Sequence, residues 1–291
     1  MRWRLWLLMA PALALLLATF AAPLGHYLWL STQAQSVLTA LKPQPIGVEQ
    51  WLRLFNDGRF WQDTWQTLRF SAASVSVEML LGLAVALLLD QPLRGRALLR
   101  TISLLPWALP TTVMALGWRW IFNDPYGPIN RLLSGLGLAA IPFLSAPSIT
   151  WIAAVGADAW KTTPFVALLL LAGLQTIPAD LYEAAALEGA TPWQTLRRIT
   201  LPLLTPYLLI ALLFRLAQAL GVFDLIQVLT GGGPAGSTES LALYAYLNAM
   251  RFLDFGYSAT VMLGSFAILL LLCGMAALAW RWSLRWQGGL R

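Results

Sequence analysis

The sequence predicts an all-α membrane protein, a polytopic bundle of about six transmembrane helices with one polar cytoplasmic loop. Three observations lead to this prediction. Of the 291 residues, 58% are hydrophobic and only 11% are charged, which is too apolar for a soluble chain of this length. The apolar residues form runs long enough to cross a hydrocarbon core of about 30 Å. Basic residues mark the ends of several runs, and the 15 Trp are typical of interfacial anchors.

Composition also excludes several classes of function. The net charge is +6, but the Arg residues stand singly at the ends of apolar runs, so we expect a lipid bilayer and no nucleic acid as partner. Cys273 is the single cysteine and His26 the single histidine. Neither a cysteine metal cluster, nor a histidine zinc site, nor an ordinary hydrolytic triad is therefore expected. We expect no cofactor.

The first apolar run covers residues 5–30 and begins after two arginines. It resembles a signal peptide at its start, but it continues through Tyr27 and Trp29 and is longer than a cleaved signal. We therefore expect an uncleaved first span with a cytoplasmic N-terminus. Residues 31–65 are mixed and polar, and we expect them outside the membrane.

The rest of the chain alternates between apolar runs and short polar segments. The prolines at Pro106 and Pro110 are expected to kink the third span. Residues 123–148 are expected to form an external re-entrant or surface segment. No repeat or linker is visible, so we expect one transmembrane domain over residues 1–291, with both termini in the cytoplasm. The remaining spans are expected at residues 67–89, 98–122, 149–176, 203–229 and 257–280.

The polar stretch at residues 182–206 lies between two long apolar runs. Pro178 suits a first helical turn, and Gly189 is placed as a C-terminal stop. Thr191 is then a new N-cap, and Gln194, three residues later, completes a capping-box pattern. The stretch therefore predicts two short helices that meet at Gly189.

The order of residues in this loop resembles the EAA signature of permease subunits of binding-protein-dependent ABC importers. The loop covers about residues 177–202. A second match follows the fifth apolar run, where Phe223-Asp224 and residues 229–234 are similar to a pattern of carbohydrate-type permeases of the maltose and glycerol-3-phosphate class. The positions that carry the EAA resemblance are Glu183, Ala184, Ala185, Gly189, Ile199, Leu201 and Pro202.

The resemblance implies a set of partners. A permease of this class pairs with a second permease subunit in a heterodimer, rests its EAA loop on a dimer of ATP-binding cassette ATPases, and receives a sugar or polyol-like solute from an extracytoplasmic solute-binding protein. It resides in the cytoplasmic (inner) membrane. The ATP chemistry is expected in a separate subunit, because Gly231-Gly232-Gly233 is followed by Pro234 and not by the lysine of a P-loop.

Four ionisable residues fall near the middle of predicted spans, where charge is costly and so is often functional. They are Glu78, Asp158, Lys161 and Arg215, and Gln218 follows one helical turn after Arg215. A role in the substrate pathway and a purely structural role remain equally open for them. Asp158 and Lys161 are three residues apart on one helix face and could pair with each other.

Arg215 shares a stripe of the fifth span with small and polar residues, so we expect it to face protein and not lipid. Two other classes of function remain as alternatives. A secondary transporter would usually show an internal repeat, and none is evident. A membrane-embedded enzyme would need a cluster of nucleophile, base or metal ligands, which the sequence does not offer.

Overall fold

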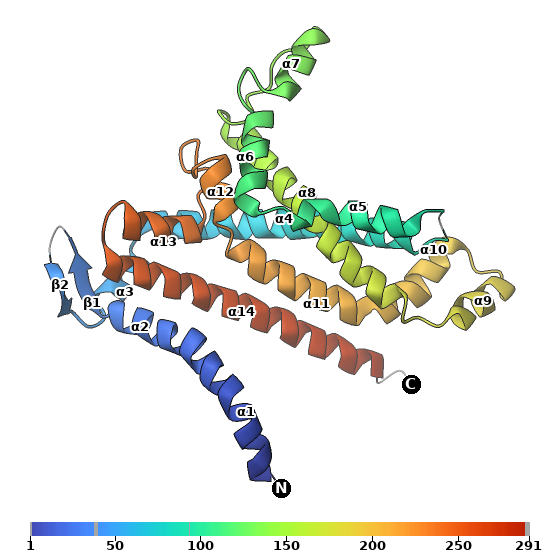
Figure 1. Cartoon of the computed structure of the whole chain (residues 1–291), viewed down its shortest axis with the longest axis horizontal. Helices are drawn as coiled ribbons and strands as arrows, with labels where there is room; N and C mark the ends of the chain where they lie inside the picture. The colour runs from blue at the N-terminus through green and yellow to red at the C-terminus, as the bar shows by residue number, and fades with distance from the viewer. Residues whose placement is uncertain (1, 38–39, 93, 289–291) are drawn as a thin grey trace. The chain divides into compact units, whose positions relative to one another are not determined.

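A computed structural model describes residues 2–37, 40–92 and 94–288, and it is built almost entirely from helices (Figure 1). Within the described residues, five helices are long and apolar enough to cross a membrane, and a bent pair of helices raises the number to six. This confirms the predicted fold class. Residues 1 and 289–291 lie outside the described residues, so the cytoplasmic location of the termini stays a prediction.

The chain divides into two compact units. Unit 1 comprises residues 1–64 and 241–270, and unit 2 comprises residues 65–240 and 271–291. Two long helices, α4 (Gly58–Asp90) and α14 (Phe255–Gly288), contribute residues to both units.

The first span of unit 1 is helical throughout. It consists of α1 (Arg2–Leu16), a π-helical turn η1 (Leu17–Ala21) and α2 (Ala22–Leu30). The stretch Met9–Leu30 passes as a membrane span by length and hydropathy. A helix at residues 5–30 was predicted, and the structure confirms it.

A small antiparallel hairpin follows the first span and was not predicted. Strand β1 (Gln33–Ser36) pairs with β2 (Ala40–Pro45), with Gln33 opposite Pro45 and a register irregularity after Ala34. Both strands are too short and too polar to show an alternating pattern.

Unit 1 has its own apolar core. It is formed where α3 (Glu49–Phe55) and the start of α4 meet α13 (Leu241–Met250) and the first turns of α14. The buried members of this core are Leu54, Phe60, Leu241, Tyr244, Ala245, Tyr257 and Val261.

The third span of the prediction is broken in the structure, not merely kinked. Helix α5 (Arg96–Ala108) and helix α6 (Thr111–Ile121) meet at an angle of 88°. The residue before a proline is driven out of the helical region, and Leu109 before Pro110 is indeed extended, with φ −70° and ψ 137°. Pro106 is tolerated inside α5, whereas Pro110 forces Leu109 out of the helical region and is the N-cap of α6, so the break lies at Leu109 and Pro110.

The fifth span also differs from the prediction at both ends. Helix α11 (Leu201–Leu220) stops at Gly221, and α12 (Asp224–Leu229) is a separate helix that packs against α6 (Figure 1). At the other end, α10 (Pro192–Thr195) and a π-helical turn η2 (Leu196–Thr200) run into α11 without a break, so that Pro192–Leu220 is one helical span of 29 residues.

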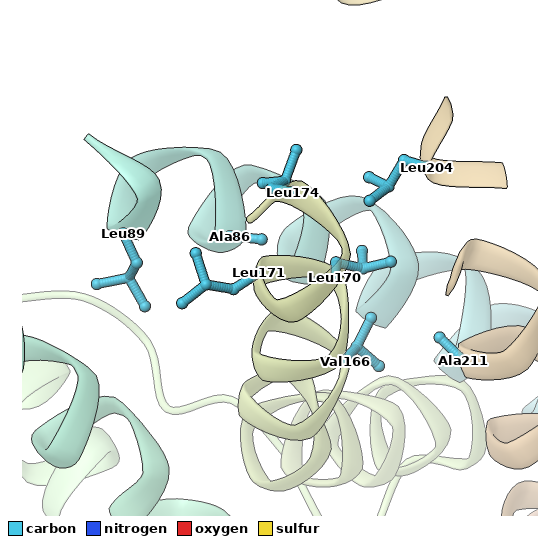
Figure 2. Packing of buried hydrophobic residues seen from close by; sticks show 8 residues of the cluster. All are labelled: Ala86, Leu89, Val166, Leu170, Leu171, Leu174, Leu204 and Ala211. Carbon is cyan, nitrogen blue, oxygen red and sulfur yellow. The ribbon is translucent and has the colours of Figure 1, made fainter. Parts of the chain in front are cut away.

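Helix α8 (Pro147–Leu174) is the most buried candidate span of unit 2 and organises its core (Figure 2). Helix α8 can approach α4 and α11 closely because a glycine lies at each of these helix contacts. A Cβ on Gly82 of α4 would lie 2.5 Å from Val166 of α8, and one on Gly173 of α8 would lie 2.5 Å from the Tyr207 ring of α11. The buried members of this core are Ala86, Leu89, Val166, Leu170, Leu171, Leu174, Leu204 and Ala211.

The segment between α6 and α8 carries one short helix, α7 (Pro128–Gly135). Asp124 closes this segment, because its carboxylate accepts hydrogen bonds from the backbone N–H groups of Phe143 and Leu144, each at 2.9 Å. The segment is therefore a structured element.

Candidate functional site

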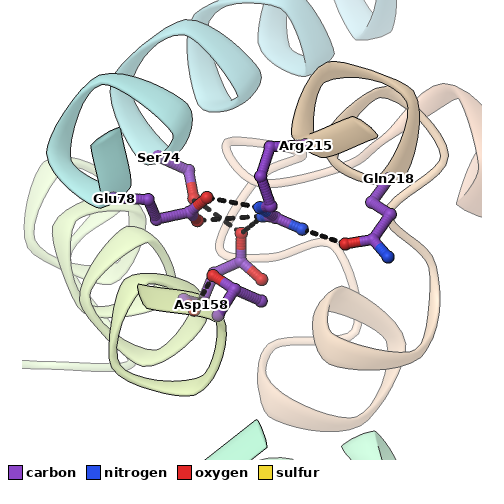
Figure 3. Close-up of polar contacts among 6 residues, drawn as sticks. Ser74, Glu78, Asp158, Arg215 and Gln218 are labelled. Carbon is purple, nitrogen blue, oxygen red and sulfur yellow. Dashed lines mark hydrogen bonds and ion pairs between the residues drawn. The ribbon is translucent and has the colours of Figure 1, made fainter. Parts of the chain in front are cut away.

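A buried ion cluster joins three helices of unit 2 (Figure 3). Arg215 of α11 is 2% exposed, and Glu78 of α4 is fully buried. The Nη2 group of Arg215 donates to Glu78 Oε1 at 2.9 Å and to Asp158 Oδ2 of α8 at 3.1 Å, while its Nε donates to Glu78 Oε2. One guanidinium thus holds two carboxylates from helices far apart in the sequence.

Two neutral side chains complete the cluster. The Ser74 hydroxyl lies 2.6 Å from both Glu78 Oε1 and Asp158 Oδ2. Gln218 accepts a hydrogen bond from Arg215 Nη1 at 2.5 Å through its Oε1. Because the amide oxygen of Gln218 is used in this way, its NH₂ group is the part left for other partners.

The cluster meets the conditions under which charge can be buried. An isolated ion in an apolar environment costs several kcal/mol, a penalty that is offset only by close pairing and further hydrogen bonds. Arg215 and the two acids provide both. The prediction that Arg215 faces protein and not lipid is confirmed.

Lys161 and Asp158 do not form the pair that their spacing allowed. The carboxylate of Asp158 bonds Arg215, whereas the ammonium of Lys161 donates to the backbone carbonyl of Leu109 at 2.6 Å. This carbonyl is accessible because the chain breaks between α5 and α6. Lys161 thus places a positive charge at the C-terminal end of α5, where the helix dipole favours it.

A cavity of about 380 Å³ lies against the cluster. Of the predicted pathway residues, Asp158, Lys161, Arg215 and Gln218 line it, while Glu78 lies behind them and does not. Several lining residues were not predicted, because they come from the broken third span and from the segment after α11. The proline pair was the available signal for the break. The further lining residues are Trp107, Thr111, Thr162, Gly221, Val222, Phe223, Asp224 and Leu225.

The polar loop at residues 177–202 has the predicted local structure. Helix α9 (Ala179–Leu187) ends in a Schellman arrangement, because Gly189 N–H donates to Ala186 and Ala190 N–H donates to Ala185, with Gly189 at φ +75°. The capping box is present, with Thr191 N–H donating to Gln194 Oε1 at 2.8 Å and Gln194 N–H donating to Thr191 Oγ1 at 3.3 Å.

One part of the loop prediction is wrong. The second helix is not short, because it continues through η2 into α11. Glu183, Ala184 and Gly189 are exposed and Ala185 is buried, while Ile199, Leu201 and Pro202 lie within the continuous helix. Arg215 is the thirteenth residue after Pro202. At 1.5 Å per residue, the loop and the ion cluster are therefore about 20 Å apart along one helix.

A second polar cluster lies in unit 1. The carboxylate of Asp57 accepts hydrogen bonds from the hydroxyls of Tyr244, at 2.5 Å, and Tyr257. Partial burial raises the pKa of Asp57, but these hydrogen bonds outweigh it and hold the pKa below its usual range. Burial and the bond to Asp57 raise the pKa of Tyr244 to about 12. The guanidinium of Arg53 covers the Tyr257 ring at 3.8 Å.

The fold and the ion cluster define a polytopic α-helical membrane protein with charged residues inside its spans. The model of the family "Binding-protein-dependent transport system inner membrane component" matches residues 78–281, which include the polar loop and every charged residue of the cluster. The chain belongs to this family.

Relatives within the family are transport permeases. The chain is 43% identical over 265 residues to the trehalose/maltose transport system permease protein MalF of Thermococcus litoralis, covering 91% of this chain and 89% of that one. It is 38% identical to the sulfoquinovosyl glycerol transport system permease protein SmoG of Agrobacterium fabrum, covering 92% and 90%.

Solved structures agree with this assignment. A bacterial ABC transporter involved in the import of the acidic polysaccharide alginate contains a chain that matches with a TM-score of 0.82 at 25% identity, covering 96% of this chain and 95% of that one. The alginate transporter in complex with its pentasaccharide-bound periplasmic protein matches with a TM-score of 0.81 at 24% identity, covering 94% and 92%. The protein is thus a permease subunit of an ABC transporter.

Proposed function

We propose that this permease forms part of the translocation path for a sugar or polyol-like solute and is driven by a separate ATPase. The relatives named for trehalose, maltose and sulfoquinovosyl glycerol transport support the solute class. The cavity beside Arg215 is the candidate path within this chain, because it lies against charged and hydrogen-bonding groups inside the spans.

The continuous helix from Pro192 to Leu220 is the observation that carries the proposal. It joins an exposed loop to the buried cluster through a single rigid element. In the proposed mechanism, Glu183, Ala184 and Gly189 present the docking face for the ATPase dimer, and Ala185 fixes α9 against the protein. Ile199, Leu201 and Pro202 lie in the segment that transmits the movement to α11.

The partners follow from the same proposal. A second permease subunit completes the path as a heterodimer, and an extracytoplasmic solute-binding protein delivers the solute. The chain then resides in the cytoplasmic membrane with both termini and the EAA loop inside. The structure of the bacterial alginate ABC transporter in complex with a periplasmic protein supports such an assembly.

Copurification followed by reconstitution tests the proposal. The tagged chain is coexpressed with a candidate ATPase, a candidate second permease and a candidate solute-binding protein from the same organism, purified, and placed in proteoliposomes. We expect an ATPase and a second permease to copurify, and uptake to require ATP and the binding protein. A secondary transporter or a membrane-embedded enzyme would be active without these partners, and that result would contradict the proposal.

A further inference from the structure

Family membership leaves the charge of the solute open. Trehalose and maltose are uncharged, whereas sulfoquinovosyl glycerol carries a sulfonate, and permeases for both are relatives of this chain. We propose that Glu78 and Asp158 set the charge selectivity of the cavity by neutralising Arg215, so that the path accepts uncharged polyhydroxy solutes and rejects anions. This inference rests on the proposed function.

The guanidinium of Arg215 has little capacity left for an anion. A guanidinium has five N–H donors and binds carboxylates or sulfonates best through two parallel bonds. Here four hydrogen bonds are already made, two to Glu78, one to Asp158 and one to Gln218. An anionic solute would have to displace one of the resident carboxylates.

The charge balance around the cavity points the same way. Asp158 and Asp224 line the cavity and Glu78 lies directly behind it, against the cations Arg215 and Lys161. The ammonium of Lys161 is already bonded to the carbonyl of Leu109 at 2.6 Å. Positive charge is therefore not in excess here, and a solute anion would gain no net attraction.

The groups that remain suit hydroxyls. The NH₂ group of Gln218 can donate, because its oxygen is held by Arg215. Asp158 Oδ1 can accept, since the hydrogen bonds of its carboxylate within the described residues go to Oδ2. A hydroxyl both donates and accepts, so a pair of this kind matches a sugar or polyol. The indole of Trp107 adds an apolar surface to the same cavity.

Glu78 is the residue on which a test can be based. It is fully buried and does not line the cavity, so it acts on the solute through the residues it contacts, Arg215 directly and Asp158 through the Ser74 hydroxyl. Glu78 is thus a positioning residue. Replacing it with Gln keeps its size but removes one of the two counter-charges on Arg215, so that a solute anion competes only with Asp158 for the guanidinium.

The experiment measures equilibrium binding to the purified permease–ATPase complex without the binding protein, so that delivery does not set the selectivity. The probes are uncharged disaccharides (trehalose, maltose, cellobiose and lactose) and the matching aldonates maltobionate, cellobionate and lactobionate. We expect the wild-type complex to bind at least one uncharged sugar and to bind each aldonate more weakly than its parent sugar. Glu78→Gln should strengthen aldonate binding at least about tenfold, or about 1.4 kcal/mol.

Two further variants keep the test decisive. Glu78→Asp retains the charge and should keep the selectivity of the wild type. Asp158→Asn removes the other counter-charge and should shift selectivity in the same direction as Glu78→Gln, which covers the case in which Glu78→Gln does not assemble.

Wild-type preference for an aldonate over its parent sugar would overturn the inference, as would unchanged aldonate binding in both charge-removing variants. A complex that assembles with its ATPase but binds none of the probes would also overturn it, while leaving the permease assignment in place. If the wild-type chain does not associate with an ATPase at all, that result would instead contradict the proposed function.

Discussion

Arg215 carries a positive charge inside a membrane span, and this charge needs close counter-charges to be buried. Its charge is acceptable at 2% exposure because Glu78 and Asp158 approach it from two other helices. The two acids depend on Arg215 in turn, because its guanidinium is the counter-charge of both buried carboxylates. Without it, two carboxylates that share the Ser74 hydroxyl would face each other in a buried site.

The first prediction concerns this dependence. Arg215→Ala should destabilise the subunit by about 3–5 kcal/mol, because it leaves buried carboxylates without a counter-charge. The expected result is a clear loss of folded subunit in the membrane, measured by fluorescence-detected size-exclusion chromatography. Arg251→Ala, at an exposed site, is the control and should behave as wild type. Normal assembly and uptake by Arg215→Ala would refute a structural role for the cluster.

The second prediction uses the Asp57 cluster of unit 1. The pKa of Asp57 is lowered in the folded state, so its contribution to stability is present above the unfolded pKa of about 3.9 and is lost as pH falls through the folded value. Asp57→Asn should therefore lower the melting temperature at pH 5–7, and this difference should shrink toward pH 3. Asp90→Asn, at the exposed end of α4, should show no such pH-dependent difference. An equal loss at every pH would contradict the electrostatic origin.

The sequence predicted which way Arg215 faces but not what it touches. Small and polar neighbours such as Ala211 and Ala219 define the protein-facing stripe of α11, and both are buried. The partners depend on which helices lie beside α11, which a single sequence does not reveal. The spacing of Asp158 and Lys161 suggested a local pair, and the tertiary contact of Asp158 with Arg215 replaced it.

At the scale of elements, glycines decide how closely the spans pack. Gly173 stands where α8 meets α11. At Gly156 of the same helix, no neighbouring atom lies within 4 Å of the position that a Cβ would take. The two positions form a matched pair within α8.

The third prediction compares them. Gly173→Ala should destabilise the subunit by about 1–3 kcal/mol, because the new methyl group would overlap the Tyr207 ring at 2.5 Å. Gly156→Ala should be neutral or slightly stabilising, since a glycine within a helix costs up to about 1 kcal/mol. Thermal unfolding of the purified variants provides the comparison. Equal melting temperatures for the two would mean that the α8–α11 contact is looser than the structure indicates.

Element boundaries were predictable where a local signal was strong. The Thr191–Gln194 capping box and the Gly189 stop are encoded within a few residues, and both are present. The break at Pro106 and Pro110 was underestimated, because a proline pair shows that a helix is disturbed but not through what angle. The angle is 88°, and α6 packs against α12, a contact with a segment distant in sequence that the proline pair does not encode.

At the scale of the whole molecule, the exposed loop and the buried cluster share one helix. The fourth prediction tests whether the loop joint matters for coupling. Gly189 has φ +75°, which strains most other residues, and no neighbouring atom lies within 4 Å of the position that a Cβ would take, so the space directly around this position is open. A bulky substituent would project into the space where we propose that the partner docks.

Gly189→Asn tolerates the left-handed conformation and adds a modest side chain, Gly189→Ala tests the backbone cost, and Gly189→Trp adds bulk. We expect Gly189→Trp to insert normally, to retain ATP hydrolysis by the complex and to lose uptake, while Gly189→Asn keeps most of its uptake. The ratio of solute transported to ATP hydrolysed is the measurement. Normal uptake by Gly189→Trp would argue against docking at this joint.

Site-specific photocrosslinking tests whether the loop docks on the ATPase. A benzophenone amino acid is placed at Leu187 (89% exposed) or Trp193 (66%) of the loop, and at Leu270 (56%) of α14 as the control. In transport-competent complexes, we predict that both loop positions form adducts with the ATPase subunit, identified by mass spectrometry, and that Leu270 does not. Complexes that transport normally but yield no ATPase adduct from Leu187 or Trp193 would contradict docking of the loop on the ATPase.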